Sequence, residues 1–169
     1  MVSLGDFYMD AESIVFGYIF FMILIYAIAI GITIARKQRI KEQIEGLANN
    51  TLEMTPEEFM KMRKTTLGGR GRPSYALTQN FAGVYIIYNH TKNMYYVGQG
   101  KQILNRVNSH FTGKGNGDVY ADYKYGDYFT IKMISLENSG YRTLNELEKD
   151  TIMTYNAFSK GYNRTRGNR

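Results

Sequence analysis

Six side chains in the C-terminal half of the chain are of the types that hydrolyse phosphodiesters. They are Tyr85, Tyr96, Arg106, His110, Glu148 and Asn163. An arginine neutralises charge on phosphoryl oxygens, and a single carboxylate can hold a hard cation such as Mg²⁺ together with waters and phosphate. A tyrosine or a histidine can orient the attacking water or take its proton. Each residue type alone is usually solvated or structural, so the interpretation depends on the elements that position all six.

The first two of these side chains lie in a stretch that predicts a β-hairpin, residues 83–98. Two β-branched and aromatic runs, VYIIY and MYYV, are bounded by glycines and separated by the polar break NHTKN. A hairpin of this length places Tyr85 and Tyr96 at or near opposing positions on neighbouring strands. An unperturbed phenol has a pKa near ~10, so a tyrosine base would need a metal ion or Arg106 nearby.

A predicted helix that begins at residues 100–102 and ends near Phe111 carries the next pair. Leu104, Val107 and Phe111 would face the core. Arg106 and His110 are four residues apart, so they share one helix face, beside the apolar stripe, where they can border a cleft.

The last predicted helix begins at Thr143, with Glu146 completing a capping box. Its apolar face would continue to Phe158, with Gly161 as the stop. Glu148 lies at the edge of this apolar face, an unusual place for a carboxylate that binds nothing. Between the two helices the sequence predicts a short helix over 118–125 and a strand over 128–136.

These residues resemble the signature of the GIY-YIG nuclease family. Gly83-Val84-Tyr85 stands for GIY and Tyr96-Val97-Gly98 stands for YIG, with valine replacing isoleucine in both. Arg106 follows the second tyrosine by ten residues and His110 by four more. Glu148 precedes Asn163 of the Gly-Tyr-Asn ending by fifteen residues. The resemblance covers residues 81–165.

The resemblance implies an α/β fold with a three-stranded antiparallel sheet flanked by helices, and DNA as the substrate. It implies that Glu148 holds one divalent metal, Mg²⁺ or Mn²⁺, and that Arg106 stabilises a phosphorane-like transition state. Tyr85 would act on the nucleophilic water as base or orienter, while Tyr96, His110 and Asn163 support the site. No DNA-reading domain follows the nuclease domain, which argues against site-specific homing.

An uncharged run of 22 residues, 14–35, predicts a single transmembrane helix. At ~1.5 Å per residue it would span ~33 Å, enough for a ~30 Å hydrocarbon core. The acidic residues before the run argue against a signal peptide. The basic residues that begin at Arg36 predict that the C-terminal part is cytoplasmic and that segment 1–13 is extracytoplasmic. The membrane that the helix crosses is expected to be the cell membrane.

Residues 36–80 are predicted to be a basic, partly helical linker. It would contain a polar helix that ends near Asn49 and a second helix capped by Thr55-Pro56-Glu57-Glu58, which would be either a docking helix or a stalk. The segment RGRP is either a flexible basic linker or, like the core of an AT-hook, a minor-groove reader. The predicted DNA-binding residues are Arg70, Arg72, Lys101 and Lys114.

The chain has 169 residues, a formal charge of +6 and no cysteine, which excludes disulfides and Cys-based zinc sites. Its basic residues are concentrated after residue 35, including a basic tail at 166–169, as expected for a polyanionic partner. We therefore expect a membrane-anchored, metal-dependent DNA endonuclease, with no obligate protein partner evident, acting on DNA that enters the cell. The alternatives are a catalytically inactive, membrane-tethered DNA-binding module and an outward-facing nuclease for DNA uptake.

Overall fold

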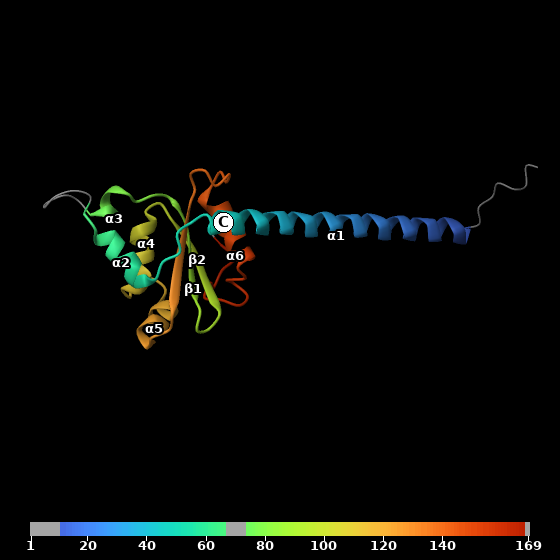
Figure 1. Cartoon of the computed structure of the whole chain (residues 1–169). Coiled ribbons are helices and arrows are strands. Elements are labelled where there is room, and N and C mark those ends of the chain that lie inside the picture. Colours follow the sequence, from blue (N-terminus) through green and yellow to red (C-terminus); the bar gives the residue numbers. More distant parts are fainter. Residues whose placement is uncertain (1–10, 67–73, 168–169) are drawn as a thin grey trace, which may run out of the picture. The chain divides into compact units, whose positions relative to one another are not determined.

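The computed structural model describes residues 11–66 and 74–167 of the chain (Figure 1). These residues divide into two compact units, Met1–Arg39 and Ile40–Arg169. Each unit is described by itself.

The first unit consists of the N-terminal part of one long helix, α1 (Ala11–Asn49). The most apolar window of α1 has a mean hydropathy of 2.5, and none of it is buried. By length and composition, α1 is long and apolar enough to cross a membrane. The predicted polar helix after residue 35 is the continuation of α1, and its predicted end near Asn49 is confirmed.

The second unit is built on a sheet of three strands, β1 (Gly83–Asn89), β2 (Met94–Gly100) and β3 (Phe129–Ser135). The strand order is β2-β1-β3, and both pairs are antiparallel, which confirms the predicted architecture. Tyr85 pairs with Gly98, and Ile87 pairs with Tyr96. The two motif tyrosines are therefore diagonal neighbours on one face, two positions out of register.

Four helices cover the sheet face to which Tyr85 and Ile87 point. They are α2 (Pro56–Lys64), α3 (Tyr75–Thr78), α4 (Ile103–Phe111) and α5 (Gly117–Tyr125) (Figure 1). The alternate strand residues Val84, Ile86 and Ile134 face the other side, where α6 (Leu144–Thr154) and the end of α1 pack. On that side Ile44 and Leu147 have no exposed surface.

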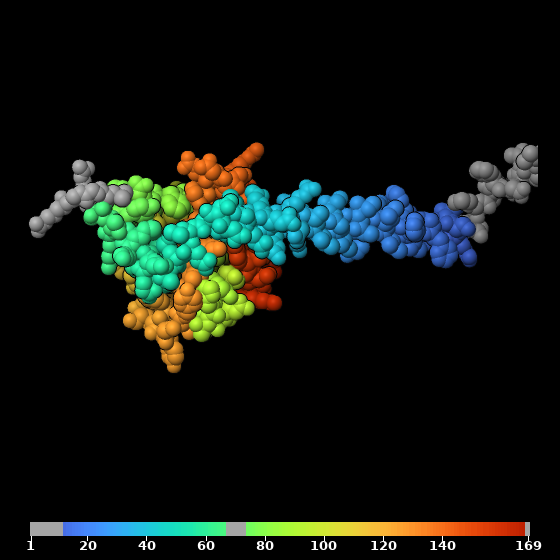
Figure 2. Space-filling view, in the orientation of Figure 1, coloured from blue at the N-terminus to red at the C-terminus, as the bar shows by residue number. Residues whose placement is uncertain are grey.

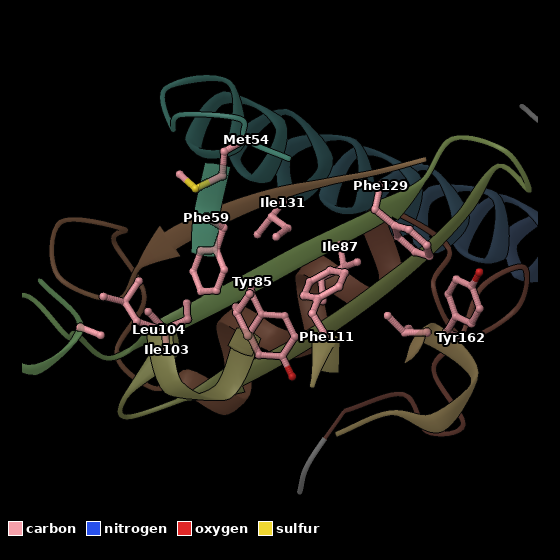
Figure 3. Packing of buried hydrophobic residues seen from close by; sticks show 13 residues of the cluster. Met54, Phe59, Tyr85, Ile87, Ile103, Leu104, Phe111, Phe129, Ile131 and Tyr162 are labelled. Atoms are coloured by element: carbon pink, nitrogen blue, oxygen red, sulfur yellow. The ribbon is translucent and has the colours of Figure 1, made fainter. Parts of the chain in front are cut away.

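The second unit begins well before the hairpin, because α2 is part of its core. Phe59 of α2 is fully buried and points into the cluster that contains Tyr85 and Leu104 (Figure 3). Met54 exchanges two backbone hydrogen bonds with Ile131 of β3, at 3.1 and 2.8 Å. The space-filling view shows the segment from the end of α1 to α2 lying directly against the rest of the second unit (Figure 2). Most of the segment predicted as a linker thus packs on the sheet, and α2 is a docked helix.

The caps of α2 and α5 agree with the sequence. Thr55 and Glu58 form the predicted capping box. Gly126 ends α5 in the left-handed conformation, with φ 103°.

The predicted extent of the last helix is wrong. The helix α6 ends at Thr154, and Asn156 has φ 51°, which turns the chain away from the helix axis. Phe158 is therefore outside the helix and 40 % exposed. Gly161 has a different role from a helix stop, because a Cβ there would overlap the carbonyl oxygen of Tyr95. The glycine lets the C-terminal segment approach β2.

Candidate active site

Tyr85, Tyr96 and His110 form one aromatic cluster on the helical side of the sheet. The Tyr85 hydroxyl oxygen lies 2.8 Å from Nε2 of His110. The ring centroids of Tyr85 and Tyr96 are 6.0 Å apart, and those of Tyr96 and His110 are 4.9 Å apart in an edge-on arrangement. The structure thus brings together three of the six residues selected from the sequence. His110 does not border a cleft as predicted, because it has no exposed surface.

The hydrogen bonds of His110 define which of its nitrogens carries the proton. Nδ1 is 2.8 Å from the backbone nitrogen of Asn116, which can only donate. Burial, aided by the positive charge of Arg106, lowers the pKa of His110 to about 4, so the ring is neutral at pH 7. Its one proton is therefore on Nε2, and His110 donates it to the hydroxyl oxygen of Tyr85.

The hydroxyl group of Tyr85 is held in a defined position. Burial, followed by the neighbouring Tyr96, raises the pKa of Tyr85 well above its usual range, while Arg106 acts in the opposite direction. Tyr85 is therefore a neutral phenol in the free protein at pH 7. In this state it can orient a water molecule, and it can act as a base only after it has lost its own proton, which bound positive charge would favour against the effect of burial.

Three consecutive residues of β2 contact three different parts of the predicted site. A Cβ at Gly98 would overlap the Tyr85 hydroxyl, so this position must lack a side chain. Gln99 donates from Nε2 to Oε2 of Glu148, at 2.9 Å. A Cβ at Gly100 would lie 3.3 Å from Cβ of Arg106. The end of β2 is therefore next to all three predicted residues, with Tyr85 and Arg106 on one face of the sheet and Glu148 on the other.

The strand β2 can be next to residues from both faces of the sheet because it lies at the edge of the sheet. The Tyr85 side chain is on the side covered by α4, whereas α6, which carries Glu148, packs on the other side. Within residues 11–66 and 74–167, no further strand pairs with the outer edge of β2. Groups from both faces can therefore reach the same ligand around this edge.

Glu148 is the carboxylate of the site, and it is only 6 % exposed. The amide of Gln99 bridges Glu148 and Asn145, donating to Oδ1 of Asn145 at 2.7 Å. No group of three or more His, Cys, Asp or Glu suited to a metal occurs among the residues that the structure describes. One carboxylate with an amide oxygen beside it fits Mg²⁺, which usually keeps several waters and takes few protein ligands.

Arg106 and Asn163 complete the predicted set in different ways. Arg106 is exposed on α4, as expected for a group that contacts phosphate. Asn163 caps the outer edge of β2, where its side chain accepts from the Val97 nitrogen at 2.8 Å and donates to the Val97 carbonyl at 2.7 Å. Its observed contacts are therefore those of a support for β2.

The predicted DNA-binding residues fall into two groups. Lys101 and Lys114 are exposed at the two ends of α4. Arg70 and Arg72 lie outside the described residues.

Reading the sequence did not select Gln99, Asn145, Gly115 or Asn116, although all four support the site. Gln99 directly follows the second motif triplet, and Asn145 precedes Glu148 by three residues, on the same face of a helix. These spacings were signals that could have been used. Gly115 and Asn116 had no such signal, because their role depends on a loop that folds over His110, where a Cβ at Gly115 would overlap the ring.

Comparison with known proteins gives one match. Residues 81–163 match the family model described as the GIY-YIG catalytic domain. No curated protein matches the chain. No solved structure matches it either.

Proposed function

Because residues 81–163 are a GIY-YIG catalytic domain, we propose that this protein is a metal-dependent DNA endonuclease anchored in a membrane. The observation that carries the proposal is the position of Gly98, Gln99 and Gly100: Gly98 lies against the Tyr85 hydroxyl, Gln99 bonds to Glu148, and a side chain at Gly100 would meet Arg106. Residues chosen for phosphodiester chemistry are gathered around one strand edge.

Hydrolysis requires a water in line with the scissile bond and a means to stabilise charge on the phosphate. We assign the second task to Arg106, whose exposed guanidinium can donate two parallel hydrogen bonds to phosphoryl oxygens. Glu148, oriented by Gln99, would hold Mg²⁺ or Mn²⁺. That ion, when bound, polarises the phosphate and stabilises the leaving oxygen.

We assign the water to Tyr85. The His110 Nε2–H bond fixes one lone pair of the phenol oxygen and leaves the other to accept from the water. Because the Tyr85 side chain is only 1 % exposed in the free protein, we propose that this water reaches the hydroxyl when DNA is bound. To act as a base Tyr85 would first have to lose its own proton to solvent, and Arg106, together with an ion held by Glu148, would favour this because positive charge lowers the pKa of a nearby phenol. The phenolate could then accept the proton of the attacking water. Tyr96 packs against the Tyr85 ring and would limit the positions that the water can take.

The membrane anchor would replace sequence recognition by location. A nuclease domain on the cytoplasmic side would meet DNA as it enters the cell. The uncharged run 14–35 and the basic residues that follow it support this topology. Arg70 and Arg72, with Lys101 and Lys114, would add phosphate contacts.

The activity is tested with the full chain in detergent, supercoiled plasmid and Mg²⁺. We expect nicking that is lost on chelation of the metal and reduced at least ~10²-fold in Arg106→Ala and Glu148→Ala. Equal nicking by the wild type and both variants would show a contaminant, and DNA binding without nicking would support the inactive binding module.

The topology needs a separate experiment. A reporter fused after Arg169 should show that the C-terminus of the chain is on the cytoplasmic side of the membrane. A signal on the outer side would favour the nuclease for DNA uptake. A variant that lacks residues 1–39 keeps the whole second unit, and it should restrict incoming DNA less well in cells.

A further inference from the structure

We propose that Arg63 of α2 binds a DNA backbone phosphate, so that a helix outside the GIY-YIG domain extends the nuclease surface. This inference rests on the proposed function, because it takes DNA as the ligand. The matched region begins at residue 81, and α2 precedes it.

The position of α2 relative to the catalytic helix is fixed by packing. Phe59 is fully buried beneath α2, and the helix is capped by Thr55 and Glu58. Near its C-terminal end, Nη2 of Arg63 donates to Oδ1 of Asn105 in α4, at 2.9 Å. Asn105 directly precedes Arg106 in α4. Arg63 is therefore bonded to the residue next to Arg106. The helices α2 and α4 that carry the two arginines lie on the same side of the sheet (Figure 1).

The guanidinium of Arg63 is under-used in the free protein. It has five N–H donors, of which the hydrogen bond to Asn105 uses one. Its Nε–H is buried and has no hydrogen-bond partner. Among the described residues, no Asp or Glu forms an ion pair with Arg63. The buried Nε–H is out of reach of an external anion, so the terminal Nη groups of this half-buried side chain, which no carboxylate neutralises, are the donors that we assign to a phosphate.

The distribution of charge along the chain points to a polyanion. Residues 59–117 hold nine of the 21 Lys and Arg residues and none of the 15 Asp and Glu residues. This stretch includes most of α2, the hairpin and α4. In α2 itself the acids are in the first turn and the bases Lys61, Arg63 and Lys64 are in the last turn, next to α4. A stretch that carries bases and no acids, and that includes Arg106, suits a DNA backbone.

The test measures binding of the full chain in detergent to a fluorescent DNA duplex, without divalent metal, over a series of salt concentrations. Arg63→Ala should weaken binding about tenfold, as expected for a lost hydrogen bond to a charged group. It should also reduce the slope of log K against log salt by about 0.9, the value for one phosphate contact. Arg63→Lys should keep the slope.

Two matched controls separate phosphate binding from structural support. Asn105→Ala breaks the same bond between α2 and α4 but keeps the charge, so it should leave the slope unchanged. Lys41→Ala removes a charge that Glu45 already pairs with at 3.8 Å, and should also leave it unchanged. If Asn105→Ala reproduces the loss seen in Arg63→Ala, the role is structural and the inference is wrong.

The cleavage kinetics provide an independent readout. Arg63→Ala should raise KM for plasmid and leave kcat at saturating DNA unchanged. A lower kcat with an unchanged KM would overturn the inference. If the wild type binds no duplex at any salt concentration, the proposed function fails instead, whereas an unchanged slope in Arg63→Ala against a DNA-binding wild type refutes only the role of Arg63.

Discussion

At the scale of single residues, the protein fixes one hydroxyl group by surrounding it. The Tyr85 oxygen accepts a hydrogen bond from His110 and lies where Gly98 has no side chain. His110 is in turn held by the backbone nitrogen of Asn116. The chain therefore controls the direction of this hydroxyl through two layers of contacts, which is the preorganisation that an attacking water requires.

Tyr85→Phe tests that hydroxyl directly. We expect a loss of cleavage of ~10²–10⁴-fold, because the group that acts on the water is absent. The free energy of unfolding should fall by ~1–3 kcal/mol, since the buried Nε2–H of His110 loses its acceptor. Tyr88→Phe is the control, because it removes a hydroxyl from the same strand that donates to Asn93, away from His110. Equal activity in Tyr85→Phe and the wild type would exclude Tyr85 from the reaction.

His110 makes the stability of the domain depend on pH. Its pKa falls from 6.5 in the unfolded chain to about 4 in the folded protein, chiefly through burial. The unfolded state therefore binds more protons between these values, and the stabilisation present above pH 6.5 is lost as the pH falls toward 4. The difference corresponds to about 3 kcal/mol.

Urea unfolding at pH 7 and at pH 4 measures this loss. His110→Gln serves as the comparison, because other carboxylates titrate equally in both proteins. We expect the wild type to lose about 3 kcal/mol more than the variant between these two pH values. An identical loss in both proteins would mean that the pKa of His110 is the same in the folded and unfolded states, which would contradict the lowered pKa.

At the scale of elements, the edge strand β2 and the helix α2 decide where the site lies. Asn163 occupies part of the outer edge of β2, and the next part of the strand carries Gly98, Gln99 and Gly100. The helix α2 closes the core beneath Tyr85 by inserting Phe59 (Figure 3). An element outside the matched family region thus supports the catalytic tyrosine.

Phe59→Ala tests the contribution of α2. Removing this fully buried ring should lower the free energy of unfolding by ~3–5 kcal/mol. Leu77→Ala, at a side chain that is 74 % exposed in α3, should change it by less than ~0.5 kcal/mol. Urea unfolding of the full chain in detergent makes the comparison. If Phe59→Ala hardly changed the free energy of unfolding, α2 would not contribute to the core and the linker prediction would be right.

At the scale of the whole molecule, a helix with an uncharged run, residues 14–35, and a basic unit that contains the GIY-YIG domain are joined in one chain. If α1 spans a membrane, two arginines within it should prevent insertion, at ~2.5–3.5 kcal/mol each near the centre. We expect Ile23→Arg combined with Ile30→Arg to move the protein out of the carbonate-resistant membrane fraction. Ile23→Leu with Ile30→Leu is the matched control and should stay in it. A charged variant that remains in the membrane would contradict the anchor.

Local patterns in the sequence determined most of the architecture. Alternation and turn residues predicted the three strands, and capping residues predicted the starts of α2 and α6, because these features depend on neighbours a few positions away. The spacing of Tyr85, Arg106, His110 and Glu148 predicted the family, which the match over residues 81–163 confirmed. The early end of α6 was missed because Asn156 adopts a left-handed backbone conformation that its residue type only weakly favours.

Only the tertiary structure decided which residues meet. The sequence placed Tyr85 and Glu148 in different elements, and the fold puts them on opposite faces of the sheet, both next to the edge strand β2. It also decided that His110 is buried and neutral, and that α2 belongs to the core rather than to a linker. Such relations join residues distant along the chain, where spacing in the sequence carries no information about contact. The sequence therefore predicts the chemistry through the types and spacing of six side chains. The fold decides that Tyr85, Arg106 and Glu148 lie next to the end of β2.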